Sequence, residues 1–417
     1  MTGQSFRASL RLLRTRRFGT FWFASLLSNI GTWAQQLAQP WLLLSLGASP
    51  FLLGLDTFVM GAPVLLLTLV GGALADGSDR RRIIVFFQSI QMLCPILLVV
   101  LLLTGSVQPW IVIVLSLVVG ITDALSMPSF QSIVPSIVER GQIPSAIALN
   151  STQFNLSRIL GPAIAGVLMA SVGAAGAFAV SAASYVPFIL VAWWILPRTV
   201  SVVSVRDGFD HRKLVASVAQ VLHDANLRGA LATVFASSLL CAPLITFCPV
   251  LVKEVFQGDI SHFSLSMGAF GVGGLLGAVG LLAVDPDRDR RPLSSGFALA
   301  YGVVVVLAAV NRWSWGLPML LVLAGFAMTA SNASANALLQ AAAPARIRGQ
   351  TVSLFMLAMR GGLALGGLAT GLSVSLLGVR EALLVNGVLA VLAHTAIRRA
   401  WLRTPLPKAM VRADGET

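Results

Sequence analysis

The chain has 417 residues, of which 56% are hydrophobic and only 11% charged. A soluble domain carries about 25% charged residues, so the polar surface that a water-soluble protein of this length needs is missing. The net charge of +13 would favour a nucleic-acid partner in a soluble protein. Here the basic residues gather at the ends of apolar runs, where they orient a membrane protein. The composition predicts an integral membrane protein without a nucleic-acid partner.

Twelve apolar runs are long enough to cross a bilayer, which predicts an all-α membrane protein. They cover residues 19–46, 51–75, 83–104, 109–130, 144–170, 174–196, 227–252, 261–284, 293–310, 315–340, 350–372 and 378–398. With both chain ends inside, the cytoplasmic segments hold 24 of the 29 Lys and Arg residues and the external segments hold three. This asymmetry predicts that both termini are cytoplasmic.

The longest break between runs, Pro197–Asn226, divides the chain into two sets of six. In it, Leu214, Val218, Val221 and Leu222 share one helical face, which predicts a short amphipathic helix on the inner membrane surface. The expected organisation is a bundle over 1–196, a linker over 197–226, a second bundle over 227–400 and a cytoplasmic tail over 401–417.

Two charged turns lie half a chain apart. Gly71–Arg82 reads GGALADGSDRRR, and Gly280–Arg291 again leads from a glycine-containing apolar segment into acids and bases. Asp76 to Arg81 and Asp285 to Arg290 are both five residues apart, with an offset of 209 between the two copies. Two related halves in a hydrophobic chain indicate a transporter whose halves rock about a central site.

Glycine pairs four residues apart mark places where helices can approach closely. They are Gly273–Gly277, Gly362–Gly366 and Gly367–Gly371. For these pairs we expect packing alone. For Gly161 and Pro162, in the fifth run, we expect packing together with a place in a moving seam.

Metal and enzyme chemistry has no pattern to support it. Cys94, Cys241 and Cys248 lie inside apolar runs without CxxC spacing, and the four histidines are scattered. We interpret the cysteines as small buried hydrophobic residues. No nucleophile–base set or phosphate-binding loop occurs, and the soluble loops are too short to hold one. We expect no enzymatic activity, no metal and no bound cofactor.

The string Gly72-Ala-Leu-Ala-Asp76, followed by Arg80 and Arg81, resembles the signature of the major facilitator superfamily between helices two and three. This chain has Gly77 where the family commonly has a base, and Asp79 where it has glycine. The later stretch from Ala148 to Gly166, with Arg158-Ile-Leu-Gly161-Pro162 in it, is similar to the exporter branch that contains the enterobactin exporter and macrolide and multidrug efflux proteins.

The resemblance implies two pseudo-symmetric six-helix bundles, a binding cavity between them near mid-membrane, and alternating access driven by a proton or ion gradient. In the family the acid at Asp76 faces the start of helix eleven. Here that start, Arg348–Thr351, offers free backbone N–H groups worth up to about 1–2 kcal/mol to an anion. We expect a cytoplasmic latch, the alternative being a turn acid that only orients the chain. The predicted gating set is Gly72, Asp76, Arg80, Arg81, Asp285, Arg290, Gly161 and Pro162.

Asp123 is the carboxylate placed deepest in a predicted span, where a charge costs about 2.5–3.5 kcal/mol unless it is paired or hydrated. Arg158 and Arg360 are the available bases, and their spacing of 202 suggests equivalent positions in the two halves. Either Asp123 exchanges a proton, or it forms a permanent brace with Arg158. Asp56, within about two turns of the external end of its run, could simply reach water and is a weaker candidate for proton coupling.

Polar residues form stripes on several predicted helices, and amides facing lipid would lack partners. Any one amide can instead form an interhelical hydrogen bond. Together with aromatic and Met side chains the stripes would suit a bulky, uncharged or amphipathic ligand. The candidate binding residues are Asn29, Trp33, Gln36, Asn150, Gln153, Phe235, Phe247, Asn332, Asn336 and Met356.

These patterns predict a monomeric secondary transporter of a bacterial inner membrane that exports a drug-like compound or a siderophore by proton antiport. An uptake permease of the same fold is the nearest alternative, because direction depends on gradients and coupling. A lipid flippase is the third, with Arg158 and Arg360 as a head-group pocket.

Overall fold

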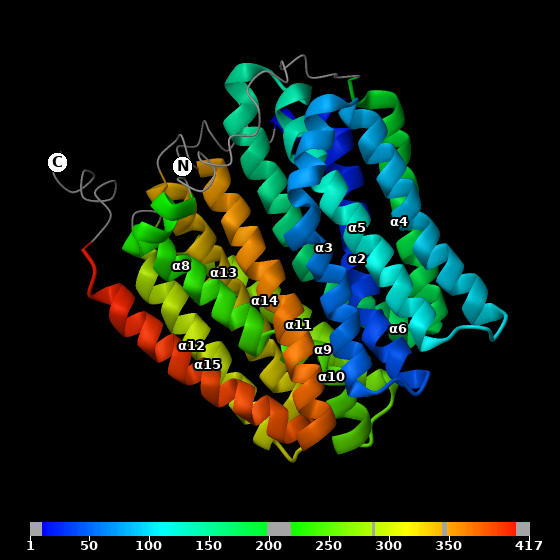
Figure 1. Ribbon diagram of the computed structural model, residues 1–417, viewed down its shortest axis with the longest axis vertical. Helices are drawn as coiled ribbons and strands as arrows, with labels where there is room; N and C mark the ends of the chain where they lie inside the picture. The colour runs from blue at the N-terminus through cyan, green and yellow to red at the C-terminus, as the bar shows by residue number, and fades with distance from the viewer. Residues whose placement is uncertain (1–10, 198–217, 286–287, 344–347, 406–417) are drawn as a thin grey trace. The chain divides into compact units, whose positions relative to one another are not determined.

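A computed structural model of the protein describes residues 11–197, 218–285, 288–343 and 348–405 (Figure 1). Within these ranges the chain forms helices and no strands. The first helices are α2 (Phe18–Ser45), α3 (Pro50–Gly77), α4 (Arg80–Leu103), α5 (Pro109–Ile133) and α6 (Ile143–Ile195), with short 3₁₀ turns at Val134–Ile137 and Arg140–Gln142. The later ones are α8 (Ala225–Ala236), α9 (Pro243–Thr246), α10 (Cys248–Val250), α11 (Ile260–Leu282), α12 (Arg290–Val310), α13 (Gly316–Ala342), α14 (Arg348–Leu377) and α15 (Val379–Leu402), with π-helical turns η3 (Ser237–Cys241) and η4 (Leu251–Val255).

Ten helical segments in the described part are long and apolar enough to cross a membrane. One of them, in α6, covers both the fifth and the sixth predicted runs. Its helix is interrupted at Gly173, which has a φ of 68° and lies between these two runs. Helix α2 is not among the ten, but its 28 residues match the predicted first run. Every predicted run thus has a helix, and the all-α membrane fold is confirmed.

Each of the two charged turns ends in an aspartate that caps the N-terminus of the next helix. Asp79 is the N-cap of α4 and accepts a hydrogen bond from the amide of Arg81 at 3.1 Å. Asp289 is the N-cap of α12 and accepts one from the amide of Arg291 at 2.9 Å. An aspartate satisfies the free N–H groups of a first turn and carries the charge that this helix end favours.

The side chain that opens each of these helices repeats as well. Arg80 Nε donates to the carbonyl of Ala75 at 3.3 Å, and Arg290 Nη2 donates to the carbonyl of Asp285 at 3.3 Å. Both bonds reach back five residues. The two turns therefore correspond at an offset of 210, which corrects the offset of 209 and the pairing of Arg81 with Arg290.

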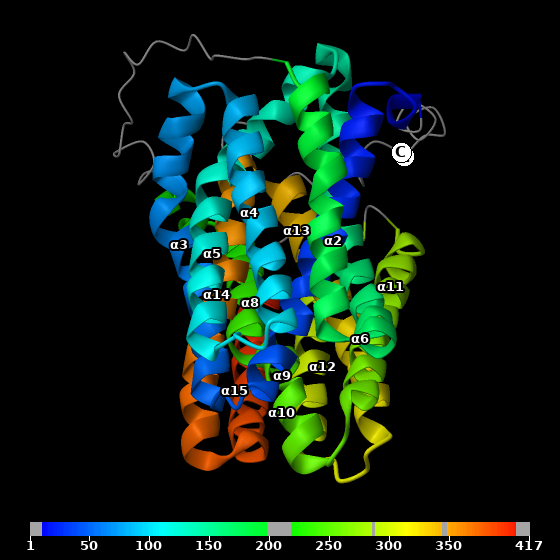
Figure 2. The same ribbon diagram turned by 90° about the vertical axis from the view of Figure 1, so that its right-hand side faces the viewer.

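The described residues fall into two compact units, Met1–Ala48 with Ala62–Val205 and Ser49–Gly61 with Arg206–Thr417. In the first unit α2 runs along α6, and α4 packs against α5 and α6 (Figure 2). Its core holds Phe21, Phe188 and Phe130, with the last two rings stacked at a centroid distance of 5.3 Å.

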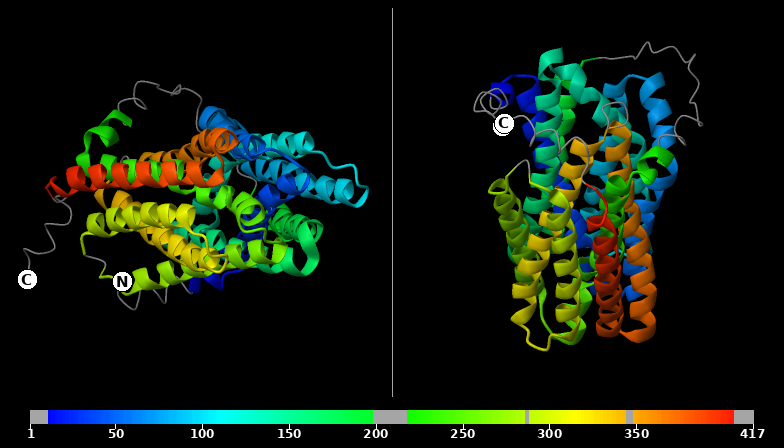
Figure 3. Two further views of the ribbon diagram at one scale, coloured as in Figure 1. Left: turned by 90° about the horizontal axis from the view of Figure 1, so that it is seen from below. Right: turned by 90° about the vertical axis from the view of Figure 1, so that its left-hand side faces the viewer.

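In the second unit α12 lies beside α15, α11 beside α13, and α14 beside α15 (Figure 3). A core cluster joins α8, α13, α14 and α15 through Val234, Leu338, Phe355 and Trp401. Trp401, expected in a free tail, is buried at the end of α15. The tail beyond 405 lies outside the described residues, and so does Leu214 of the predicted amphipathic face, whereas Val218 is half-buried and Leu222 exposed. Of that face, Val221 is buried in this cluster.

Helix α3 is shared between the units, because its residues up to Gly61 count with the second one. There, a Cβ added to Gly367 would lie 2.9 Å from Cβ of Thr57, and one added to Gly371 would lie 3.0 Å from Cα of Gly54. Such contacts are possible only between residues without large side chains. The predicted helix packing at Gly367 and Gly371 is confirmed.

The other two predicted glycine pairs also mark close helix packing. A Cβ at Gly273 would overlap the carbonyl of Val322 in α13, and one at Gly277 would lie 2.7 Å from the carbonyl of Phe326. Gly362 and Gly366 meet α8 and η3 in the same way. The backbones approach each other at these positions because no side chain stands between them.

Candidate transport site and cytoplasmic gate

Gly161 allows α6 to touch α2 at the centre of the first unit. A Cβ there would overlap Cβ of Trp33 and would lie 3.4 Å from both the amide nitrogen of Ala34 and the carbonyl oxygen of Ile30. The Trp33 ring then packs edge-on against Phe154 at a centroid distance of 6.2 Å. The packing role of Gly161 is confirmed. The side chain of its neighbour Pro162 lies outside the described residues.

Gly362 occupies the same place in the second unit. A Cβ there would lie 2.8 Å from Cβ of Ser238, 3.3 Å from the amide nitrogen of Leu239 and 2.9 Å from the carbonyl oxygen of Phe235. These are the same three atoms, at the same three relative positions, that surround Gly161 in α2.

Gly161 and Gly362 thus correspond at an offset of 201. In this register Arg158 corresponds to Met359, one residue before Arg360. The expectation that Arg158 and Arg360 are equivalent is wrong, because one residue rotates a helical side chain by about 100°.

Asp123 is half-buried in α5, ten residues before the helix ends at Ile133, or about 15 Å at 1.5 Å per residue. In the same unit, α6 buries Tyr185 together with its phenol hydroxyl. That hydroxyl forms a hydrogen bond of 2.8 Å with Thr32 Oγ1 in α2. This bond joins α2 and α6 in the unit that contains Asp123. The side chain of Arg158 lies outside the described residues, so its brace with Asp123 stays a prediction.

Gly71 brings the gating motif next to Asp123. A Cβ at Gly71 would lie 2.6 Å from the carbonyl oxygen of Ala124 and 2.9 Å from Cα of Leu125. At the predicted motif glycine, Gly72, a Cβ would meet nothing within 4 Å in the described part. The residue that sets the approach of α3 to α5 is thus Gly71, which the motif comparison passed over.

The two motif bases join helix ends on one side of the first unit. Arg80 Nη1 donates to the carbonyl of Ser132, near the end of α5, at 3.4 Å. The guanidinium of Arg81 stands 5.1 Å above the ring centroid of Trp193, near the end of α6, a cation–π contact. The side chain of Asp76, and those of Arg348 and Gly349, lie outside the described residues, so the latch between them stays a prediction.

Asp56 differs from expectation. Its side chain is 2% exposed, although its position along α3 suggested access to water. On either side of it in the sequence, Gly54 and Thr57 pack closely against α14. A carboxylate that is shielded from water is a stronger candidate for proton exchange than one that is always hydrated.

The amides of α2 divide into two groups. Gln35 Oε1 accepts a hydrogen bond of 2.9 Å from Ser181, and Gln39 Nε2 donates one of 2.6 Å to Ser116, so both hold helices together. The predicted stripe lies beside them, and Asn29, Trp33 and Gln36 are each half-buried.

In α6, Asn150 is half-buried. Gln153 is buried, and its Nε2 has no hydrogen-bond partner among the described residues. A buried amide without a partner costs about 1–3 kcal/mol, so a ligand or water that bonds it would be favoured.

The second unit holds the remaining candidates. Asn332 in α13 is buried with no hydrogen-bond partner for Oδ1 among the described residues, whereas Asn336 Oδ1 accepts from Gln340 at 3.2 Å. Phe235 is exposed and Met356 half-buried. Phe247 is completely buried between α9 and α10, so it does not line an open surface here, contrary to its prediction as a binding residue.

Arg291 is a buried cation that sequence reasoning missed. It is 5% exposed and forms an ion pair of 3.0 Å with Asp289. Its Nη1 also donates to Asn226 Oδ1 at 3.2 Å and to the carbonyl of Thr404 at 2.8 Å. The guanidinium joins the start of α12, the start of α8 and the end of α15. The sequence signal that could have indicated this ion pair is Asp289, which lies two residues before Arg291 at the start of a helix.

Replacing Arg291 by Met is expected to destabilise the folded chain by about 2–3 kcal/mol, because Asn226 and Asp289 lose a charged partner. Arg288, which is exposed in the same turn, is the matched control. Thermal unfolding in detergent should show a lower Tm for R291M than for R288M. Equal Tm values for the two variants would contradict the role given to Arg291.

The predicted burial of Cys94, Cys241 and Cys248 is confirmed. Within the described ranges, no group of three or more His, Cys, Asp or Glu side chains is placed to hold a metal ion.

The chain is similar to several curated transport proteins, three of which illustrate their range. The chain is 28% identical to the staphyloferrin A transporter of Staphylococcus aureus, over 61% of this chain and 64% of that one. It is 27% identical to the multidrug efflux pump Tap of Mycolicibacterium fortuitum, over 88% and 93% of the two chains. It is 25% identical to the enterobactin exporter EntS of Salmonella choleraesuis, over 98% and 100%.

Solved structures share the fold. A D-xylose–proton symporter superposes with a TM-score of 0.72 at 14% identity, covering 94% of this chain and 99% of that one. An inward-facing bacterial homologue of the lysosomal transporter Spinster superposes with a TM-score of 0.69 at 16% identity, covering 94% and 99%. The sequence profile of the family described as transmembrane secretion effector matches residues 7–413. The chain therefore belongs to the transmembrane secretion effector family of the major facilitator superfamily.

Proposed function

We propose that this multi-pass membrane protein is a secondary active exporter of a bulky organic molecule, either a drug-like compound or a siderophore. The match that carries this proposal is the one over nearly the full length to a multidrug efflux pump and to an enterobactin exporter. The binding residues we propose are the half-buried Asn29, Trp33 and Gln36 in α2 and Asn150 in α6. A surface of scattered amides and aromatic rings suits an amphipathic cargo.

We propose that the proton gradient drives export by proton antiport, without a bound cofactor. Asp123 is the first candidate for the carrier, because it lies deep in α5, next to the close contact between Gly71 and Ala124. A protonated carboxyl is neutral and inexpensive to hold at this depth, whereas the carboxylate needs water or a positive partner. A change in hydration during the transport cycle would therefore make the group bind a proton on one side and release it on the other.

The protein is proposed to lie in a bacterial inner membrane as a monomer, with both termini cytoplasmic. In this arrangement the basic turns that lead into Arg80 and Arg290 would lie on the same side as the termini, as the distribution of positive charge requires. Reporter fusions at each terminus and at the turn near Trp313 test this orientation. Only the reporter near Trp313 should lie outside the cell membrane.

Transport itself is tested in a bacterial strain that lacks its own efflux pumps. Cells expressing the chain should accumulate less of at least one compound from a panel of macrolides, cationic dyes and enterobactin, and an uncoupler should abolish that difference. Higher accumulation than in cells without the chain would instead show an uptake permease. No change for any compound, at confirmed expression, would contradict export of this class of molecule.

A further inference from the structure

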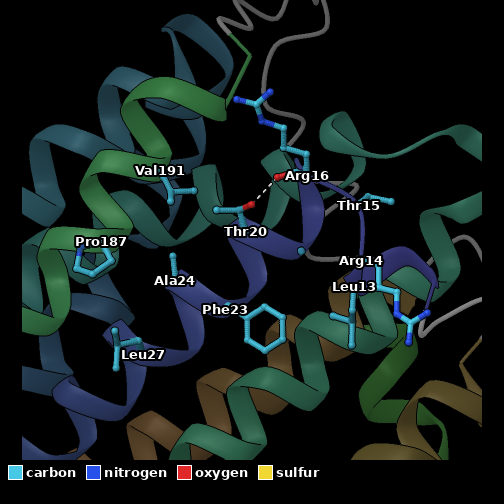
Figure 4. Close-up of a pocket in the computed structure, with 11 residues that line it drawn as sticks. Leu13, Arg14, Thr15, Arg16, Thr20, Phe23, Ala24, Leu27, Pro187 and Val191 are labelled. Atoms are coloured by element: carbon cyan, nitrogen blue, oxygen red, sulfur yellow. Dashed lines mark hydrogen bonds between the residues drawn. The ribbon is translucent and has the colours of Figure 1, made fainter.

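A cavity of about 530 Å³ lies in the first unit, away from the candidate transport site (Figure 4). It is formed by the segment that precedes α2, by the first turns of α2 and by the last turns of α6. None of its lining residues belongs to the gating or binding sets.

One part of the lining is basic and polar. Arg14 and Arg16 are exposed at two places on its rim, and Thr20 lies beside Arg16 with its hydroxyl donating to the carbonyl of Arg16 (Figure 4). The lining contains no acidic residue, so nothing within it offsets the two guanidinium charges. This part is suited to an anion.

The other part is apolar. Phe23 is 57% exposed and Leu27 is 46% exposed, and both face outward from α2. Pro187 and Val191 of α6 complete it. Large apolar side chains that remain exposed in a membrane helix lie against hydrocarbon.

The two parts are spaced as a phospholipid requires. Leu27 is nine residues after the first residue of α2, Phe18, which is about 14 Å along the helix axis. That length extends from the membrane surface to about the middle of a hydrocarbon core of about 30 Å. The arginines lie at the polar end and the apolar side chains follow at increasing depth.

We propose that this cavity binds one anionic phospholipid, with its phosphate at Arg16 and Thr20, Arg14 adding positive charge at the rim, and one acyl chain along Phe23 and Leu27. A free phosphate would use only the basic end and leave the apolar part unoccupied. A zwitterionic lipid would bring a positive head group to two arginines. A bound lipid would hold the segment before α2 against α2 and α6. The proposal is independent of the cargo and of the direction of transport.

The test uses native mass spectrometry of the full chain in detergent, titrated with phosphatidylglycerol or phosphatidylcholine. One phosphatidylglycerol should be retained with clear preference over phosphatidylcholine. Basic residues near an anionic lipid surface contribute about a factor of five each, so R14Q with R16Q should weaken that retention by roughly thirtyfold. Leu27→Ala should weaken it less, since only part of the chain contact is lost.

R399Q with R403Q is the matched control, because it removes two exposed arginines from α15 and its end. It should leave phosphatidylglycerol retention unchanged. An equal loss in the control would show nonspecific attraction and overturn the proposal. Glycerophosphoglycerol, which lacks acyl chains, should not compete, and competition at similar concentration would show a simple phosphate site instead. Equal retention of both lipids would also overturn it.

Discussion

Asp123→Asn is expected to reduce pH-driven transport to the level of cells without the chain, while binding of the cargo persists. Asparagine keeps the shape of the side chain but cannot exchange a proton between pH 6 and 8. It also removes a charge that costs about 2.5–3.5 kcal/mol in a span, so expression should not fall. The measurement is cargo flux from proteoliposomes under an imposed pH gradient, with cargo binding measured separately.

Asp123→Glu, which retains a carboxyl group, is the conservative control and should retain part of the flux. Asp56→Asn is the comparison at the other candidate carboxyl, which the structure shows to be shielded from water. If D123N transports normally across this pH range and D56N does not, the coupling role passes to Asp56. If both variants transport normally, proton exchange at these two groups is contradicted.

Gly273→Ala is expected to destabilise the second unit by about 1–3 kcal/mol or more, the usual cost of overpacking. Its Cβ would overlap the carbonyl of Val322, and a Cβ at Gly325 in α13 would overlap that of Phe270. The contact is therefore reciprocal and formed by backbone, which cannot rotate away as a side chain can. The helices would have to separate. A loss of about 1–3 kcal/mol in the free energy of unfolding should lower Tm in detergent by several degrees.

Gly268→Ala in the same helix provides the control, because a Cβ there meets nothing within 4 Å. Alanine is favoured over glycine in a helix by about 1 kcal/mol, so G268A should be neutral or slightly stabilising. Similar Tm values for the two variants would mean that α11 and α13 do not meet closely at Gly273.

The spans could be predicted because long apolar runs and basic ends are properties of the local sequence. The register of the two charged turns could not, since it depends on which acid begins a helix. Sequence comparison paired Asp76 with Asp285, whereas the structure pairs the N-caps Asp79 and Asp289.

Burial across a helix was equally difficult to predict. Depth along α3 suggested that Asp56 reaches water, but it is buried, and the residues beside it, Gly54 and Thr57, pack on α14, about 300 residues later in the sequence. Gly71 and Gly72 are adjacent, and only the position of α5 shows which of them is in contact. Such side-to-side relations between distant helices depend on tertiary packing, which hydropathy does not record.

Helix α3 has a mechanical consequence, since its residues up to Gly61 count with one unit and those from Ala62 with the other. Pro63 lies inside the helix, immediately past that division. Proline has no N–H to donate to the carbonyl of Val59, and its ring weakens the helix at that turn. Pro63→Ala would supply that donor, so we expect it to stiffen α3 at this turn.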